Sequence, residues 1–116
     1  MLCTRRDFNV VALATIIARH SSKNQRITCA ELAGKLGCAH SYTEQMIAGL
    51  RASNVIEGQR GLRGGFRLVG LPEDYSVYDL LAASKVPAKF EMPKQSVKFD
   101  KLLDDYLASI TLADLL

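Results

Sequence analysis

The chain has 116 residues, enough for one domain with a modest core. Its 48% of apolar and 23% of charged residues exclude an intrinsically disordered chain and predict a folded, soluble protein. The net charge of +3 is unevenly divided: residues 1–71 carry ten Lys/Arg and four Asp/Glu, a charge of +6, and residues 72–116 carry five and eight, a charge of −3. This asymmetry favours one face for a polyanion and another face for a different contact.

The first segment, about Arg6 to His20, is apolar almost all round and predicts a central helix covered on several sides. Its longest apolar run, Val10–Ala18, is far too short to span a membrane. Arg19-His20 follow where a signal peptide would carry small residues. We therefore expect a cytoplasmic protein with no membrane partner.

Two short helices are expected next, joined by a tight turn that contains a glycine. Thr28 is predicted to cap the first helix, which has Glu31 at its third position and stops at Gly37. Ser41 is predicted to cap the second helix, with Glu44 completing the same capping box. This arrangement is typical of a helix-turn-helix motif.

A β-hairpin is predicted after the second of these helices. Val55–Glu57 and Phe66–Val69 have the alternating pattern of strands, and a turn separates them. Phe66 and Leu68 are expected to face inward and Arg67 outward. The fold class that follows is mainly α with a small β-hairpin.

The turn lies within Gln59–Gly70, QRGLRGGFRLVG, which holds four glycines and three arginines. An enzymatic phosphate loop is not favoured, because neither Lys nor a hydroxyl follows Gly65 and a strand-like segment follows instead of a helix. A mobile surface turn explains the glycines but not Arg60, Arg63 and Arg67 beside them. A hairpin that contacts nucleic acid explains both, because arginines pair with phosphates and with a narrow minor groove. A helix-turn-helix followed by such a hairpin is a winged helix.

The acidic half is predicted to be helical with one irregular segment. Ser76 with Asp79 is expected to start a helix, and Lys85–Gln95, which holds two prolines, is expected to be irregular. Thr111 is expected to cap a last turn. An apolar stripe of helical spacing precedes that turn and consists of Phe99, Leu102, Leu103, Tyr106, Leu107 and Ile110.

Catalytic and metal sites are not predicted. No nucleophile–base pair or carboxylate constellation can be assembled, so we expect no enzyme. The three cysteines form no CxxC pair, and a packing role is favoured for Cys29 and Cys38 over a sensing or metal role. His20 and His40 lack a ligand pattern.

The segment SYTEQMIAGLRASNVIEGQRGLRGGFRL resembles the signature of the Rrf-type winged-helix repressors, the group of IscR-, NsrR- and CymR-like regulators. The resemblance also covers the start and the end of the chain. The matching residues are Ser41, Tyr42, Glu44, Gln45, Leu50, Arg51, Arg60, Gly61, Gly64, Gly65 and Phe66.

The resemblance implies that the second helix of the motif enters the major groove of DNA and that the wing enters the minor groove. The residues it assigns to double-stranded DNA are Arg5, Thr28, Ser41, Tyr42, Glu44, Gln45, Arg51, Arg60, Arg63 and Arg67. Four of these residues have an alternative local role. Ser41 and Glu44 would form the two halves of a capping box, Tyr42 would pack in the core, and Arg51 would line the helix surface. Arg60 is the strongest of these assignments.

The resemblance further implies a homodimer. Residues 1–83 would form the winged-helix domain, and residues 84–116 a loop and a C-terminal dimerisation helix within the same compact unit. The apolar stripe from Phe99 to Ile110 would cover the partner; the alternative is that it folds back onto its own domain. Many relatives hold an iron–sulfur cluster through three cysteines, but the matching stretch here, residues 84–98, contains none. We therefore expect no cofactor.

The function predicted from the sequence is a homodimeric regulator, a repressor that binds a pseudo-palindromic promoter site and answers to an unidentified effector or protein partner. Two alternatives stay open. One is a winged-helix module that docks a protein, and the other is a regulator that senses redox changes through its thiols.

Overall fold

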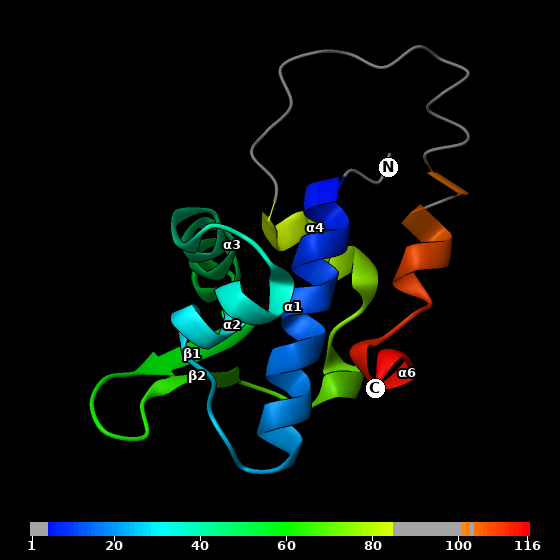
Figure 1. The fold of residues 1–116 in the computed structure, drawn as a ribbon. Helices are drawn as coiled ribbons and strands as arrows, with labels where there is room; N and C mark the ends of the chain where they lie inside the picture. Colours follow the sequence, from blue (N-terminus) through cyan, green and yellow to red (C-terminus); the bar gives the residue numbers. More distant parts are fainter. Residues whose placement is uncertain (1–4, 85–100, 103) are drawn as a thin grey trace.

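The computed structural model of the chain describes residues 5–84, 101–102 and 104–116; the side chains of residues 5, 6 and 84 fall outside this description (Figure 1). The predicted irregular segment Lys85–Gln95 also lies outside it. The elements are α1 (Arg5–Ser22), α2 (Cys29–Leu36), α3 (His40–Ala52), β1 (Ile56–Gln59), β2 (Gly65–Leu68), the 3-10 turn η1 (Pro72–Asp74), α4 (Val77–Ser84) and α6 (Leu112–Leu115).

Helix α1 is the centre of the fold, as its apolar sequence predicts. Its residues Val10, Leu13 and Ile17 are fully buried, and the helix contacts α2, α4, α6 and β2. Figure 1 shows the other elements arranged around it. Within the described residues, no helix is both long and apolar enough to cross a lipid bilayer.

Helices α2 and α3 form the predicted helix-turn-helix. The N–H of Glu31 donates to the Thr28 hydroxyl at 3.2 Å, which confirms the predicted cap of α2. Gly37 ends α2 with a φ of 66°, a left-handed conformation that glycine adopts without a Cβ clash. The two helices pack on each other through buried side chains that include Leu32, Met46 and Leu50.

Strands β1 and β2 pair antiparallel, with Ile56 opposite Leu68. Leu68 is buried, Phe66 is half-buried and Arg67 is exposed, so the predicted alternation is confirmed. Phe66 also forms a bridge with Ile27, just before α2. Strand β2 is therefore paired with β1 on one side and joined to the body of the domain through Ile27 on the other.

The acidic half includes α4 and α6, and both pack against α1. The backbone N–H of Asp79 donates to the Ser76 hydroxyl and the N–H of Ser76 donates to the Asp79 carboxylate, which confirms the predicted start of α4. The N–H of Val77 donates to the Ile110 carbonyl at 2.7 Å, and Leu112 is fully buried. The last turn of the chain is thus part of the core, and the fold is the predicted winged helix-turn-helix with a C-terminal helical segment.

Candidate nucleic-acid interface

The exposed face of α3 carries most of the polar residues predicted to meet DNA. Its buried face consists of Thr43, Met46, Ile47 and Leu50. The opposite face exposes Ser41, Glu44, Gln45 and Arg51.

Tyr42 behaves differently from its neighbours on α3. Its side chain is half-buried and packs against the main core, so the packing role considered for it is present in the structure. The guanidinium of Arg51 lies 6.0 Å from the centre of the Phe66 ring, and this cation–π contact joins α3 to β2. Arg51 therefore lines the helix surface, which is one of the two roles that we predicted for it from the sequence, the other being DNA contact.

The predicted capping box of Ser41 and Glu44 is wrong. Helix α3 begins at His40, and its N-cap is Ala39, whose side chain accepts no hydrogen bond. The reason is the fully buried Thr43, whose N–H and hydroxyl both donate to the Ala39 carbonyl at 3.0 Å. These bonds require a helical turn that already starts at Ala39. Ser41 is left exposed, and Glu44 pairs with His40 (Nδ1 to Oε1, 3.3 Å).

The wing loop between β1 and β2 is exposed and basic. Arg60 and Arg63 are exposed, and Leu62 at the tip is 98% exposed. Gly64 donates its N–H to the Gly61 carbonyl at 2.9 Å and closes the turn. A Cβ on Gly64 would lie 2.5 Å from the Gln59 carbonyl oxygen, so the turn depends on a glycine there.

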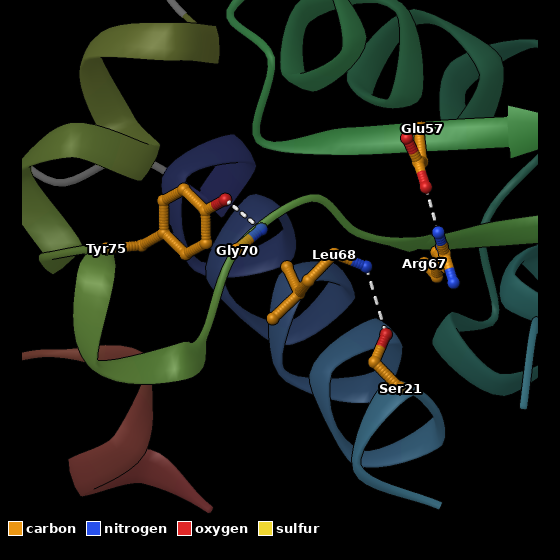
Figure 2. A network of polar contacts seen from close by, with 6 residues as sticks. All are labelled: Ser21, Glu57, Arg67, Leu68, Gly70 and Tyr75. Atoms are coloured by element: carbon orange, nitrogen blue, oxygen red, sulfur yellow. Dashed lines mark hydrogen bonds and ion pairs between the residues drawn. The ribbon is translucent and has the colours of Figure 1, made fainter. Parts of the chain in front are cut away.

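Polar bonds fix the wing to the body of the domain (Figure 2). The Leu68 N–H donates to the Ser21 hydroxyl of α1 at 2.9 Å, and the Gly70 N–H donates to the Tyr75 hydroxyl at 2.7 Å. Arg67 donates to the Glu57 carboxylate across the hairpin at 2.6 Å. Arg67, predicted as a DNA contact, therefore has a carboxylate partner on the neighbouring strand.

A hollow of about 660 Å³ lies between the wing tip and the segment that joins α1 to α2. Thr28, predicted as a phosphate contact, lines it together with Arg63. Arg26 lines it as well, and its Nε is buried without a hydrogen-bond partner among the described residues. Arg26 was not among the residues predicted to contact DNA, because it precedes the predicted cap Thr28 and belongs to no motif of the sequence.

The structure also brings together three residues that no sequence pattern connects. One ligand atom each from Cys29, His40 and Glu44 lies within 4.8 Å of the other two. Burial raises the pKa of the Cys29 thiol above its ordinary value, and the nearby Glu44 carboxylate raises it further.

The remaining predicted residues fall into two groups. The side chains of Arg5, Phe99 and Leu103 lie outside the described residues. Of the dimerisation stripe, Leu102 and Tyr106 are 62% and 65% exposed, whereas Leu107 is buried against Val77 and Leu81 of its own chain and Ile110 is half-buried. The stripe thus divides into an inner part that covers α4 and an outer part that faces solvent.

A profile of the Rrf2 family, described as iron-dependent transcriptional regulators, matches residues 4–101. The HTH-type transcriptional regulator IscR of Cereibacter sphaeroides is 28% identical over 82 residues, which are 71% of this chain and 53% of the relative. The chain thus spans about half the length of the curated relative that it matches.

Solved structures have the same fold. T. potens IscR has 29% identity and a TM-score of 0.83, over 99% of this chain and 85% of that one. The oxidized form of Staphylococcus aureus CymR has 23% identity and a TM-score of 0.82, over 99% of this chain and 95% of that one. At this identity the likeness shows the fold alone. The matched family consists of regulators and not of enzymes, as the sequence analysis predicted. Because the family match covers most of the chain, this protein belongs to the Rrf2 family of transcriptional regulators.

Proposed function

We propose that this protein is a sequence-specific regulator of transcription that binds double-stranded DNA. The observation that carries the proposal is the exposed polar face of α3 together with the exposed arginines of the wing. Figure 1 shows α3 and the hairpin loop on the same side of α1, and Arg51 of α3 stacks on Phe66 of β2. A recognition helix and a wing held in one fixed arrangement can contact neighbouring grooves of one duplex.

The front of α3 is the part proposed to read bases in the major groove. Glu44 can accept from a cytosine amino group, and Gln45 can pair with adenine. The first turn of α3 has no side-chain cap, so its backbone N–H groups can donate to a DNA phosphate together with the exposed Ser41 hydroxyl. This turn would set the depth at which α3 enters the groove.

The wing is the part proposed to bind the DNA backbone and the minor groove. Arg60 and Arg63 are exposed cations on a loop held by bonds to α1, so they reach the DNA from a fixed position. Arg26 and Thr28 face the hollow beside the wing tip, where one phosphate can meet a guanidinium and a hydroxyl. Arg67 is proposed to shape the wing through Glu57 more than to bind DNA. Arg5 is proposed as a further phosphate contact.

A homodimer is proposed through the outer part of the C-terminal stripe. Leu102 and Tyr106 are exposed. Phe8 is exposed as well, and it lines an apolar groove of about 440 Å³ together with Val11, Leu81 and Ile110. Exposed apolar side chains beside such a groove mark a surface that associates. A two-fold dimer would present two copies of α3 to a pseudo-palindromic site, where occupancy of a promoter represses transcription. Residues 1–83 would bind DNA and residues 84–116 the partner.

We propose that this chain does not hold an iron–sulfur cluster of the kind found in many relatives. Such a cluster needs thiolate ligands, and residues 84–98 contain no cysteine. Cys29 and Cys38 belong to the helix-turn-helix, away from that stretch of sequence. We propose that the regulator works without a cluster, in the cytoplasm where the chromosome lies.

The test is selection of bound fragments from randomised duplex DNA with the full-length chain. Enrichment of a pseudo-palindrome with half-sites about 10 base pairs apart is the predicted result. Enrichment of no sequence, with weak binding that depends only on charge, would contradict sequence-specific recognition and favour a protein-docking module.

A further inference from the structure

We propose that Cys29, His40 and Glu44 bind a divalent transition-metal ion of the Zn²⁺ class where α2 and α3 meet. The proposal goes beyond DNA recognition, and only its last step, the effect of the ion on DNA, rests on the proposed function.

The three side chains come from the starts of the two helices. Cys29 is the first residue of α2 and His40 the first residue of α3. Glu44 lies one turn further along α3, and side chains at i and i+4 share one face of a helix. An ion bound here would connect the two helices of the helix-turn-helix at their N-terminal ends.

The distances suit a metal ion after small side-chain rotations. Metal–ligand bonds of about 2.0 to 2.3 Å in tetrahedral geometry place ligand atoms about 3.4 to 3.7 Å apart. His40 Nδ1 and Glu44 Oε1 are already 3.3 Å apart, and all three ligand atoms lie within 4.8 Å. The side chains of His40 and Glu44 are 58% and 61% exposed, so both can turn without disturbing the core.

The chemistry of the donors selects the class of ion. A thiolate and an imidazole favour Zn²⁺ and its neighbours, whereas Mg²⁺ and Ca²⁺ prefer oxygen ligands alone. Binding replaces the thiol proton of Cys29 by a metal–sulfur bond and releases that proton to solvent. The thiolate, the carboxylate and a neutral imidazole then balance the two positive charges of the ion.

A fourth ligand position would open toward a hollow of about 250 Å³. Cys29, Glu44, Ala48, Arg51 and Phe66 line this hollow. Three protein ligands with one open position is a common arrangement for zinc, with water in the open place. The Cys29 thiol already points into this junction, since it donates to the His40 carbonyl at 4.0 Å.

The proposed effect on DNA follows from the place of Glu44 on the front of α3. Without the ion, its carboxylate is free to accept from a cytosine amino group. With the ion, the carboxylate becomes a ligand and loses that contact, a loss larger than the gain from the one-unit rise in local charge. The ion should therefore weaken binding to the selected site by about 5-fold or more, within the ordinary range of coupling between two sites.

The experiment titrates the reduced, metal-free chain with Co²⁺ and follows the absorption that a cobalt–thiolate bond produces, and then displaces Co²⁺ with Zn²⁺. Binding of one ion per chain with thiolate absorption is predicted. The variants are Cys29→Ser, which should lose the thiolate absorption, and His40→Ala and Glu44→Gln, which should bind Zn²⁺ at least about 10-fold more weakly. Cys38→Ser and His20→Ala are matched controls that should keep both the thiolate absorption and the affinity for Zn²⁺.

The absence of saturable binding would overturn the proposal, and so would thiolate absorption that survives Cys29→Ser or disappears in Cys38→Ser. Circular dichroism of each metal-free variant checks that it folds. DNA affinity is then measured with and without Zn²⁺, and Cys29→Ser should abolish the difference between the two. If the ion binds but no DNA is bound, the regulator function fails alone; if DNA is bound but no ion, the metal site fails alone.

Discussion

Ser21 at the end of α1 accepts a hydrogen bond of 2.9 Å from the backbone N–H of Leu68 in β2, although 47 residues separate them in the chain. This bond fixes the base of the wing to the central helix (Figure 2). The position of the wing relative to α3 therefore depends on a small polar residue that belongs to neither element.

Replacing Ser21 with alanine should lower the free energy of unfolding by about 1 to 3 kcal/mol, because a part-buried N–H would lose its acceptor. Urea denaturation measures this change. Ser22→Ala is the matched control, since the Ser22 hydroxyl donates to the Ala18 carbonyl of its own helix. Equal losses in the two variants would show that the bond to Leu68 contributes nothing.

Glycines 61 and 65 should respond differently to alanine. Both have positive φ, 99° and 133°, so either substitution strains the backbone by about 1 to 3 kcal/mol. A Cβ on Gly65 would in addition lie 2.7 Å from the Ile27 carbonyl carbon, whereas a Cβ on Gly61 meets open space. Thermal unfolding should show Gly65→Ala as clearly the less stable of the two, and the reverse order would contradict the attachment of β2 to Ile27.

The Cys29 thiol should react slowly with iodoacetamide at neutral pH in metal-free buffer. Burial and, after it, the Glu44 carboxylate raise its pKa, and the thiolate is the reactive form. Glu44→Gln removes one of these causes, so it should lower the pKa and shift the pH profile of alkylation to lower pH. Glu73→Gln, a change of an exposed carboxylate on η1, should leave the profile in place. An unchanged profile in Glu44→Gln would contradict the proximity of the two side chains.

Tyr106 and Leu107 are adjacent, but aspartate should have a different effect at each position: it should weaken dimerisation at 106 and stability at 107. Tyr106 is 65% exposed, so Tyr106→Asp should turn the proposed dimer into a folded monomer. Leu107 is 8% exposed and packs on Val77 and Leu81, so an aspartate there should cost several kcal/mol of stability, roughly the penalty for an unpaired buried charge. Sedimentation and denaturation separate the two results. A Tyr106→Asp protein that stays dimeric would place the interface elsewhere.

The sequence predicted the parts of the fold that depend on local chemistry. Thr28 with Glu31, and Ser76 with Asp79, are capping pairs within one helical turn, and both occur as predicted. The alternation of inward-facing Phe66 and Leu68 with outward-facing Arg67 likewise predicted the second strand of the wing correctly. These features follow from short-range geometry, which the order of residues contains directly.

The errors and omissions come from contacts between elements. Because Thr43 is buried, the N-cap of α3 is Ala39 and not the predicted Ser41, and no local rule contains that burial. Cys29 and His40 meet only because α2 and α3 pack together, so neither showed a ligand pattern in the sequence. The pairing of Arg67 with Glu57 depends on the register of the hairpin.

The claim that the wing binds DNA is tested most directly by the salt dependence of affinity for the selected site. Three proteins are compared: the unchanged chain, Arg60→Ala, and Lys101→Ala, which removes another exposed cation, from the acidic half. Arg60→Ala should bind more weakly and should reduce the slope of log K against log salt by about 0.9, the value for one phosphate contact. Lys101→Ala should keep both affinity and slope. Identical slopes and affinities for all three proteins would contradict the assignment of the wing to DNA.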